Sequence, residues 1–574
     1  MPNEIEENSV LENSGKKKWI TCAILLLVNL LNYIDRYTIV GTMTRLATYF
    51  EINDKDQGLL QTVFIVFYMI FAPLFGYLGD RYNRKMLMIS GISVWILAVF
   101  ASSFCGEKHF LLFLLCRGIV GIGEASYSTI APTVLSDLFS GALRSRVLMM
   151  FYFAIPVGSG LGFMVGSWIS LATDSWQWGV RFSPIIGIAC LLLMFTLLEE
   201  PVRGACDGAR QSGDDASWWD DCKYLYSVKS FFMVTAASIA ALFSIGAMSW
   251  WTPKFLGYSY ALIERIPKTP ADEETRIATI FGIITCMSGI LGVATGSVLS
   301  RAWRDGRSIF KNHASEKADV YICAYSMFIA LPFLFFSILS AEYSMNLCLV
   351  LIYFAIMSMC MNWAVNVDVL MYVVVANRRA SALAVQTMLA HMFGDASSPY
   401  LIGMLSDSFR GDDESNVARF FALQKALYLP TFLLVIAGAF YLAATFYVET
   451  DRREALFQMD APDAYRDPND PEDMDSLLPE VVEGREEQPA QIIHTMTHSG
   501  ESTIDENDIE KLPSDDEDTD ELINESNSIQ KPLPRIPRKS GGADAENEAY
   551  LSDETDEWDV QKREEEDGED GEVL

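Results

Sequence analysis

Two ionisable side chains, Arg117 and Glu124, interrupt an otherwise apolar stretch of the chain. They lie in RGIVGIGEASYSTIAPT (residues 117–133), which directly follows FLLFLLC (residues 110–116). In a helix, side chains seven residues apart lie on one face, about 10 Å from each other. Because a charge near the bilayer centre costs roughly 2.5 to 3.5 kcal/mol on insertion scales, this face should line a protein interior or a water-filled path. The pair is therefore either a structural ion pair or part of a polar translocation site.

The first apolar stretch also carries several polar residues. In LLLVNLLNYIDRYTIVG, the side chains of Asn29, Asn32 and Arg36 fall on one helical face, and Asp35 lies beside it. Four polar residues in one crossing are too many for a helix that faces lipid. We therefore expect them to face the same polar interior as the two charges above.

Two more polar pairs lie at membrane depth near the C-terminal end of the apolar region. NWAVNVD places Asn362 and Asn366 one helical turn apart, and HMFGDASSPYLIG does the same for His391 and Asp395. A buried histidine is more often a satisfied core residue. With an acid four residues away and a ring that titrates near physiological pH, His391 is also a candidate for proton transfer, and both interpretations stay open.

A glycine-rich turn with one acid and three bases, GYLGDRYNRK (residues 76–85), follows the second apolar run. Charges in a short loop ordinarily only fix the topology. This loop has a weaker copy, GSVLSRAWRDGRS (residues 296–308), after the eighth run, with Ser300 in the place of Asp80. Two six-span halves with matching loops are typical of an internally repeated transporter.

Hydrophobic residues make up 51% of the 574 positions and gather in runs of about 20 residues. Each run is long enough to cross a hydrocarbon core of about 30 Å. Twelve transmembrane helices are predicted, over residues 19–43, 57–78, 86–104, 110–135, 147–171, 182–199, 230–256, 277–300, 319–340, 345–375, 380–406 and 421–448. The fold class that follows is an all-α polytopic membrane protein.

The distribution of charge predicts which ends of the spans face the cytoplasm. Lys16, Lys17 and Lys18 precede the first span, and the loops after even-numbered spans contain 16 Lys and Arg residues against 9 in the odd-numbered loops. Positive residues are enriched in cytoplasmic loops, so both termini are expected in the cytoplasm. Most of the net charge of −32 belongs to residues 451–574, which hold 40 acidic and 11 basic residues.

These patterns divide the chain into five expected parts. They are a cytoplasmic N-terminal segment (1–18), a first six-helix bundle (19–199), a cytoplasmic linker (200–229), a second six-helix bundle (230–449) and an acidic cytoplasmic tail (450–574). The tail cannot bury enough apolar surface to fold, so it is predicted to be disordered. The sequence shows no nucleotide-binding loop, no cluster of metal ligands and no catalytic triad. We therefore expect a transporter rather than an enzyme, with no cofactor, metal ion or nucleic-acid partner.

The motifs NYIDRY, GYLGDRYNRK, RGIVGIGEASYSTIAPT, IPVGSGLG and HMFGDASSPYLIG together resemble the Spinster family of the major facilitator superfamily. The resemblance covers residues 19–449. It implies the major facilitator fold, in which two six-helix bundles alternate between inward-open and outward-open states around a central cavity. It also implies lipid cargo, namely lysophospholipids, sphingosine or sphingosine phosphate. The implied location is the lysosomal or late endosomal membrane, with the plasma membrane as the alternative.

The residues and the resemblance together assign three roles. Substrate binding is assigned to Asn32, Asp35, Arg36, Arg117, Glu124 and Asn362. Proton coupling is assigned to Asp35, Glu124 and His391, and cytoplasmic gating to Asp80, Arg81 and Arg84. The forked donors of the two arginines match a phosphate. Glu124 would hold a proton in a dry cavity and release it in a wet one, so protons are expected as a second partner.

Two other functions stay open. One is a major facilitator carrier of polar solutes such as sugars or organic anions, for which the sequence provides fewer polar and aromatic cavity faces than expected. The other is a membrane receptor or scaffold that does not transport and that signals through its acidic tail.

Two stretches of the tail fit the acidic dileucine pattern, in which an acid is followed after three residues by two bulky aliphatic residues. They are DMDSLL (residues 473–478) and DTDELI (residues 518–523), with Leu477, Leu478, Leu522 and Ile523 as the aliphatic pairs. Motifs of this kind are addresses read by a receptor rather than membrane anchors. They predict cytosolic sorting adaptors as partners of the tail.

Overall fold

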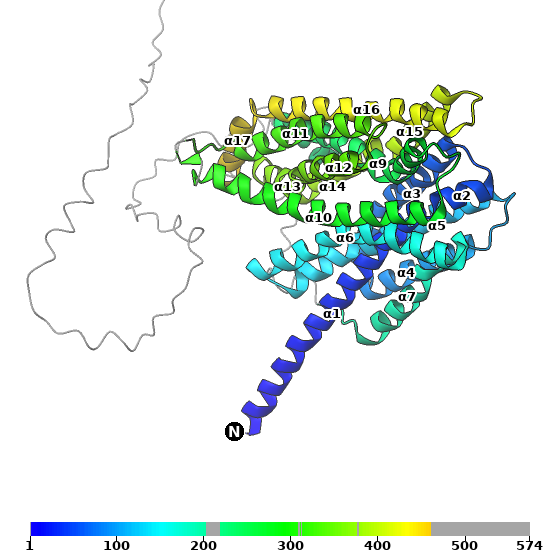
Figure 1. The fold of residues 1–574 in the computed structure, drawn as a ribbon. Helices are drawn as coiled ribbons and strands as arrows, with labels where there is room; N and C mark the ends of the chain where they lie inside the picture. Colours follow the sequence, from blue (N-terminus) through cyan, green and yellow to red (C-terminus); the bar gives the residue numbers. More distant parts are fainter. Residues whose placement is uncertain (1, 202–217, 308–309, 312, 376–377, 461–574) are drawn as a thin grey trace, which may run out of the picture. The chain divides into compact units, whose positions relative to one another are not determined.

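The computed structural model describes residues 2–201, 218–307, 310–311, 313–375 and 378–460, and all regular secondary structure in these ranges is helical (Figure 1). The first half contains α1 (Pro2–Gly41), α2 (Met43–Phe50), α3 (Asp54–Arg81), α4 (Arg84–Ser102), α5 (Phe110–Leu138), α6 (Gly141–Thr173) and α7 (Trp176–Leu197). The second half contains α9 (Lys229–Ile263), α10 (Ala271–Arg304), α11 (Ala318–Ser340), α12 (Met345–Cys360), α13 (Asn362–Val373), α14 (Arg379–Ala390), η3 (His391–Asp395), α15 (Ser397–Arg410) and α16 (Asn416–Ala444). Two shorter helices, α8 (Trp218–Ser227) and α17 (Val448–Asp460), precede and follow the second half.

Within the described ranges, 11 helical segments are long and apolar enough to cross a membrane. Each overlaps one predicted span. The remaining predicted span, 380–406, is not one continuous α-helix, because the π-helical turn η3 separates α14 from α15. A π-helical turn inserts an extra residue into the helix and is frequently found at functional sites. This one consists of the segment from His391 to Asp395 that the sequence had already singled out.

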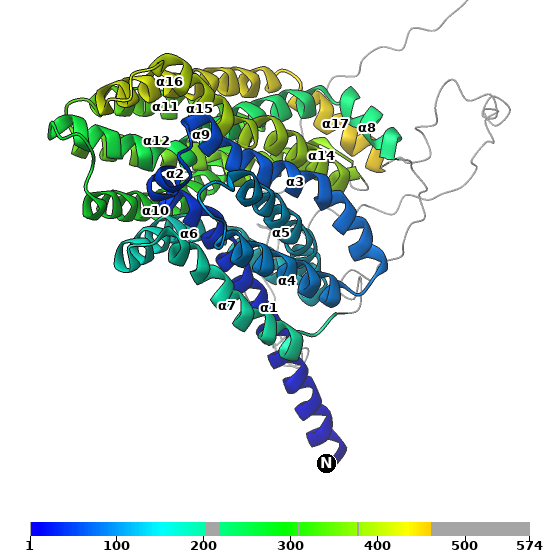
Figure 2. The same ribbon diagram turned by 90° about the vertical axis from the view of Figure 1, so that its right-hand side faces the viewer.

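The helices pack as two bundles. In the first, α1 contacts α6 and α7, and α5 contacts α3 and α4. Figure 2 shows α4, α5 and α7 close to one another in this bundle. In the second, α9 contacts α16, and α11 contacts both α12 and α16. The bundles meet mainly where α6 contacts α10 and where α3 contacts α15. This arrangement confirms the predicted fold.

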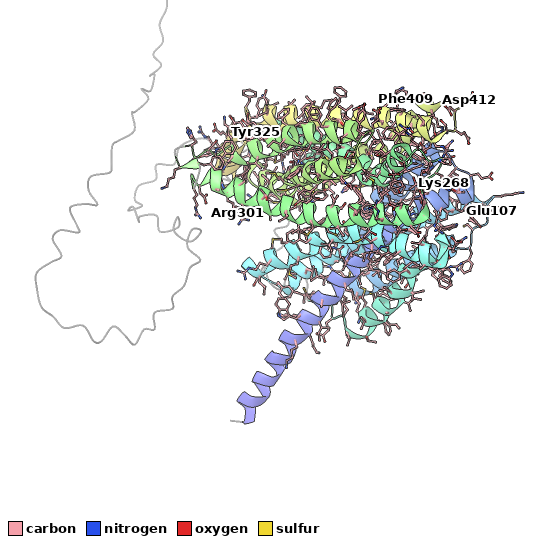
Figure 3. The ribbon with its side chains drawn as sticks, in the orientation of Figure 1. Glu107, Lys268, Arg301, Tyr325, Phe409 and Asp412 are labelled. Carbon is pink, nitrogen blue, oxygen red and sulfur yellow. The ribbon has the colours of Figure 1, made fainter. Side chains whose placement is uncertain are left out.

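The two ends of the transmembrane helices are occupied by different loops. Figure 3 shows Glu107, Lys268 and Asp412, which follow odd-numbered spans, at one end, and Arg301, at the last turn of α10, at the opposite end. We call these the odd-loop end and the even-loop end. The lysines before the first span predict that the even-loop end faces the cytoplasm.

Glycines bring helices into backbone contact within and between the bundles. A Cβ atom on Gly162 of α6 would lie 2.6 Å from the carbonyl oxygen of Ile34 in α1. Gly160, on another face of α6, meets the backbone of Gly282 in α10 across the boundary between the bundles. One glycine face of α6 thus packs inside its own bundle, and another packs against the second bundle.

Three helices lie outside the predicted spans. They are α2, α8 and α17, and α17 covers the first residues of the segment that was expected to be disordered. α17 is held in place because the Asp451 carboxylate accepts a hydrogen bond from the Ser230 main-chain N–H at 2.7 Å and the Arg452 guanidinium lies 5.3 Å from the Tyr372 ring centroid. The rest of the tail, with the four aliphatic residues assigned to sorting, lies outside the described residues.

The close contact of α6 with α1 predicts that Gly162→Ala destabilises the protein. The added methyl group would overlap a backbone oxygen that has no freedom to rotate away, and overpacking of this kind costs about 1 to 3 kcal/mol. Gly76→Ala is the matched control, because a Cβ there would meet only the Thr129 methyl group at 3.5 Å. Thermal unfolding in detergent should show a melting temperature several degrees lower for Gly162→Ala alone. Equal melting temperatures for the two variants would contradict the packing argument.

Candidate translocation site

Four buried charges form one cluster between α1 and α5, which we call the four-charge cluster. It consists of Asp35 and Arg36 on α1 and Arg117 and Glu124 on α5. Arg36 Nη2 lies 3.5 Å from Glu124 Oε2, and Arg117 Nη1 lies 3.8 Å from Asp35 Oδ2. The pairs therefore cross from one helix to the other. Arg117 and Glu124 occupy the same polar interior, as the sequence predicted, but each has its nearest opposite charge on α1.

Asp35 is the fixed member of the cluster. Its Oδ2 accepts a hydrogen bond from Trp95 Nε1 at 3.0 Å, and its Oδ1 accepts one from the Ser183 hydroxyl. Trp95 belongs to α4 and Ser183 to α7, so this carboxylate joins four helices of the first bundle. Sequence reasoning missed both donors. Each lies in an apolar run far from Asp35 along the chain, and no local pattern marks it as a partner.

The Arg36–Glu124 pair is held less tightly. Within the described ranges, the two Glu124 carboxylate oxygens and the Arg36 Nε atom have no hydrogen-bond partner, although Glu124 is only 1% exposed. The Arg36 guanidinium instead lies over aromatic rings, 4.6 Å from the Phe64 centroid and 5.4 Å from that of Tyr33. Cation–π contacts stabilise the arginine without occupying its N–H donors. Arg36 therefore keeps donors that can bind an anionic group, and so does Arg117, whose Nε and Nη2 atoms also have no hydrogen-bond partner in the described ranges.

Arg36 is also the more accessible of the two arginines. Its side chain is 10% exposed, whereas that of Arg117 is 2% exposed. The Arg117 guanidinium also lies near Phe64, 5.2 Å from the ring centroid. The geometry therefore favours Arg36 as the residue that meets a ligand and Arg117 as the residue that holds Asp35.

The two asparagines assigned to substrate binding lie in different bundles. Asn32 is buried on α1, one turn before Arg36. Asn362, on α13, donates a hydrogen bond from Nδ2 to Tyr441 Oη at 3.1 Å. Tyr441 in turn donates to Asn366 Oδ1 at 3.0 Å, and Asn366 Nδ2 donates to Gln386 Oε1 at 3.1 Å. Asn362 thus belongs to a polar network of the second bundle, whose members Tyr441 and Gln386 the sequence analysis did not single out.

His391 and Asp395 form the predicted pair inside η3. The Nδ1 atom of His391 lies 3.3 Å from Asp395 Oδ2, and the two side chains are 26% and 14% exposed. η3 contacts α9 and α3 rather than belonging to the four-charge cluster on α1 and α5. A role of His391 in proton coupling stays a prediction.

The residues assigned to gating separate into exposed and buried members. Asp80 and Arg81 are exposed, and the Arg81 guanidinium lies 3.8 Å from the Tyr77 ring centroid. Arg84 is buried and donates from Nη1 to Asp137 Oδ2 at 2.5 Å. Arg84 therefore forms a buried contact between α4 and α5. The sequence did not predict this contact, because Asp137 lies at the far end of α5.

The corresponding loop of the second half is built differently. The Ser300 hydroxyl donates a hydrogen bond to Asp319, and Arg304 Nη1 donates to Asp319 Oδ2 at 3.0 Å. Asp319 is buried at the start of α11. Ser300, which replaces the acid of the first loop, thus supports a neighbouring acid.

In the described ranges, no group of three or more His, Cys, Asp or Glu side chains is placed to hold a metal ion.

Comparison with known proteins places the chain in a family. Residues 25–399 match the family model of the Major Facilitator Superfamily. Protein spinster homolog 1 of Homo sapiens is 43% identical over 440 residues, which cover 75% of this chain and 81% of that protein. The chain belongs to the Spinster family. Protein spinster homolog 3 of Danio rerio is 42% identical over 77% of this chain and 88% of that protein.

A further relative and a solved structure agree with this assignment. The mouse protein named sphingosine-1-phosphate transporter SPNS2 is 39% identical over 76% of this Spinster-family chain and 79% of its own length. The crystal structure of a bacterial homologue of the human lysosomal transporter Spinster, inward-facing and unoccupied, matches with a TM-score of 0.65 and 18% identity. That match covers 76% of this chain and 98% of the bacterial one, and at this identity it shows the fold alone. The chain is therefore a multi-pass membrane transporter of the major facilitator superfamily.

Proposed function

We propose that this transporter carries single-chain lipids with a charged headgroup, by alternating access and with proton coupling. The substrate class is sphingosine, sphingosine phosphate and lysophospholipids. The observation that carries the proposal is the loosely held Arg36–Glu124 pair beside the tightly held Asp35 in the four-charge cluster. The mouse relative named as a sphingosine-1-phosphate transporter supports the same substrate class.

The chemistry of the cluster suits a phosphate headgroup. A guanidinium presents N–H donors in a fork that matches two phosphate oxygens. Arg36 has an unpartnered Nε in the described ranges and rests on the Phe64 and Tyr33 rings, so it can turn its donors to a ligand without leaving its place. The aromatic rings around it provide apolar surface for the adjoining part of the lipid.

Proton coupling follows from competition for Arg36. Glu124 and a phosphate headgroup are both anions, and one guanidinium cannot bind both equally well. When the headgroup takes Arg36, the Glu124 carboxylate is left without its partner at a site where its side chain is 1% exposed. A carboxylate in such surroundings is more stable when protonated. Binding of an anionic lipid is therefore accompanied by uptake of a proton at Glu124.

Uptake into vesicles tests the proposed substrate class. Purified full-length protein should accumulate labelled sphingosine phosphate or lysophospholipid, with a rate that depends on the pH difference across the membrane. A labelled sugar should neither accumulate nor compete with the lipid. Sugar uptake without lipid uptake would favour the polar-solute alternative. Absence of transport of either class would favour the receptor or scaffold.

The competition for Arg36 predicts that Glu124→Gln removes most of the pH dependence of lipid transport. The wild-type rate should change by up to about tenfold per pH unit where a single proton controls it. The introduced glutamine side chain keeps the size of the glutamate but cannot titrate, so the rate should become nearly flat. The matched control is Glu107→Gln, which changes an exposed acid in a loop. An unchanged pH profile in Glu124→Gln, at a normal amount of protein, would refute the assignment.

We also propose that the transporter resides in lysosomal or late endosomal membranes and is sorted there by its tail. Replacing Leu477, Leu478, Leu522 and Ile523 by Ala should move the protein toward the plasma membrane, because a sorting adaptor would lose its apolar contacts. Transport per molecule should stay the same. Quantitative microscopy against organelle markers measures the shift. An unaltered lysosomal fraction would show that the address lies elsewhere, with the 199–227 loop as the next candidate.

A further inference from the structure

Lys254 is a buried lysine that connects the two bundles. It lies on α9, near the odd-loop end, and is 8% exposed. Its Nζ lies 2.6 Å from Asp54 Oδ1 and 2.6 Å from Gln57 Oε1, both on the first turn of α3 in the other bundle. The Trp251 ring, at 5.4 Å, packs against the same ammonium group. Lysine is rarely buried unless it is paired, so this contact is a specific one.

A third helix completes the contact. The Ser406 hydroxyl on α15 donates to Asp54 Oδ2 at 2.7 Å. The Asp407 carboxylate, also on α15, accepts hydrogen bonds from the main-chain N–H groups of Asp54 and Lys55 at 3.2 Å and 2.8 Å. An acid from the second bundle thus caps the N-terminus of a helix in the first, where the helix dipole favours negative charge.

We propose that these residues form a latch that closes the odd-loop end of the transporter and that must open in every transport cycle. The odd-loop latch consists of Asp54, Gln57, Lys254, Ser406 and Asp407. The inference rests on the proposed function only in that the bundles move against each other; it does not depend on which solute is carried.

The position of the latch distinguishes it from the four-charge cluster. All four members of that cluster belong to the first bundle, so a rigid rocking of one bundle against the other leaves them together. The latch joins α3 to α9 and α15, so the same motion has to separate Lys254 from Asp54. Separating the two partners of a buried ion pair is strongly unfavourable when both charges stay in a dry interior. The odd-loop end can therefore open only when water reaches both charges.

Close backbone packing supports the same assignment. A Cβ atom on Gly58 of α3 would overlap the Pro399 carbonyl of α15, and one on Gly403 of α15 would overlap the Asp54 carbonyl of α3. The Thr62 hydroxyl also donates to the Ala396 carbonyl oxygen at 2.5 Å. The two helices touch along several turns beside the ion pair, so water is excluded from it in the closed arrangement.

Distances between spin labels on the two bundles test the latch. Labels at Glu107→Cys and Asp412→Cys, with the 10 native cysteines replaced, report the separation at the odd-loop end, where Figure 3 shows both residues.

Lys254→Met keeps the length of the side chain but removes its charge. It should raise the ratio of open to closed molecules by about fivefold or more, the lower end of a typical conformational coupling. The matched control, Lys425→Met, removes an exposed lysine on α16 that lies outside the latch and should leave the ratio unchanged.

A charge exchange separates the latch from general loss of packing. Asp54→Lys combined with Lys254→Asp restores an ion pair between the bundles and should bring the ratio back to within about twofold of the wild type. A wild-type ratio in Lys254→Met, or an exchanged variant that stays as open as Lys254→Met, would overturn the proposal. Where Lys254→Met does not fold, Gln57→Leu removes the second acceptor, together with the Gln57 Nε2 hydrogen bonds to Ile52, Asn53 and Asp54 at the start of α3, and should shift the ratio in the same direction. No shift in that variant would overturn the proposal equally. The measurement is made without substrate, so failure of lipid uptake would leave its result intact.

Discussion

The anchoring of Asp35 is the interaction on which the rest of the site depends. A carboxylate that is 1% exposed is stable only with full compensation, and Asp35 receives it from Trp95, Ser183 and Arg117 on three other helices. Both arginines keep spare donors in the described ranges, since Arg36 Nε, Arg117 Nε and Arg117 Nη2 have no hydrogen-bond partner. They differ in exposure, which is 10% for the Arg36 side chain and 2% for that of Arg117. In the proposed function, the Asp35–Arg117 pair keeps the helices in place, and Arg36 exchanges Glu124 for a headgroup.

A second set of buried charges, the Lys254–Asp54 ion pair, lies at the odd-loop end. The four-charge cluster lies inside one bundle and stays together when the bundles rock, whereas the contact of Lys254 with Asp54 crosses between them. In the proposed transport cycle, exchange of a proton or headgroup and opening of the odd-loop latch therefore use different residues. The glycine contacts between α6 and α10 and between α3 and α15 allow the bundles to approach closely enough for both kinds of contact to exclude water.

The sequence predicted the membrane spans well, because a run of about 20 apolar residues has few alternatives to crossing the bilayer. It also singled out Arg117 and Glu124, since a charge within such a run is conspicuous. It did not predict which side chains form hydrogen bonds or ion pairs with each other. The partners of Asp35 lie on α4 and α7, and nothing in the apolar surroundings of Trp95 or Ser183 marks them as donors. The sequence did not single out Lys254, because it lies near the end of the predicted span 230–256. A lysine at the end of a span ordinarily extends its ammonium group to the membrane surface. The division of the eleventh span by η3 depends on packing against α9 and α3, which hydropathy does not encode.

In the proposed function, an anionic headgroup and a proton bind the four-charge cluster together, because the headgroup takes Arg36 from Glu124. The most direct measurement is the number of protons taken up when sphingosine phosphate binds to the purified protein in weakly buffered detergent solution. We expect the wild type to take up protons on binding lipid, with the number approaching one per lipid as the pH is raised to values at which Glu124 is ionised, and Glu124→Gln to take up close to none. Lipid binding without proton uptake in the wild type, or equal uptake in both proteins, would contradict it.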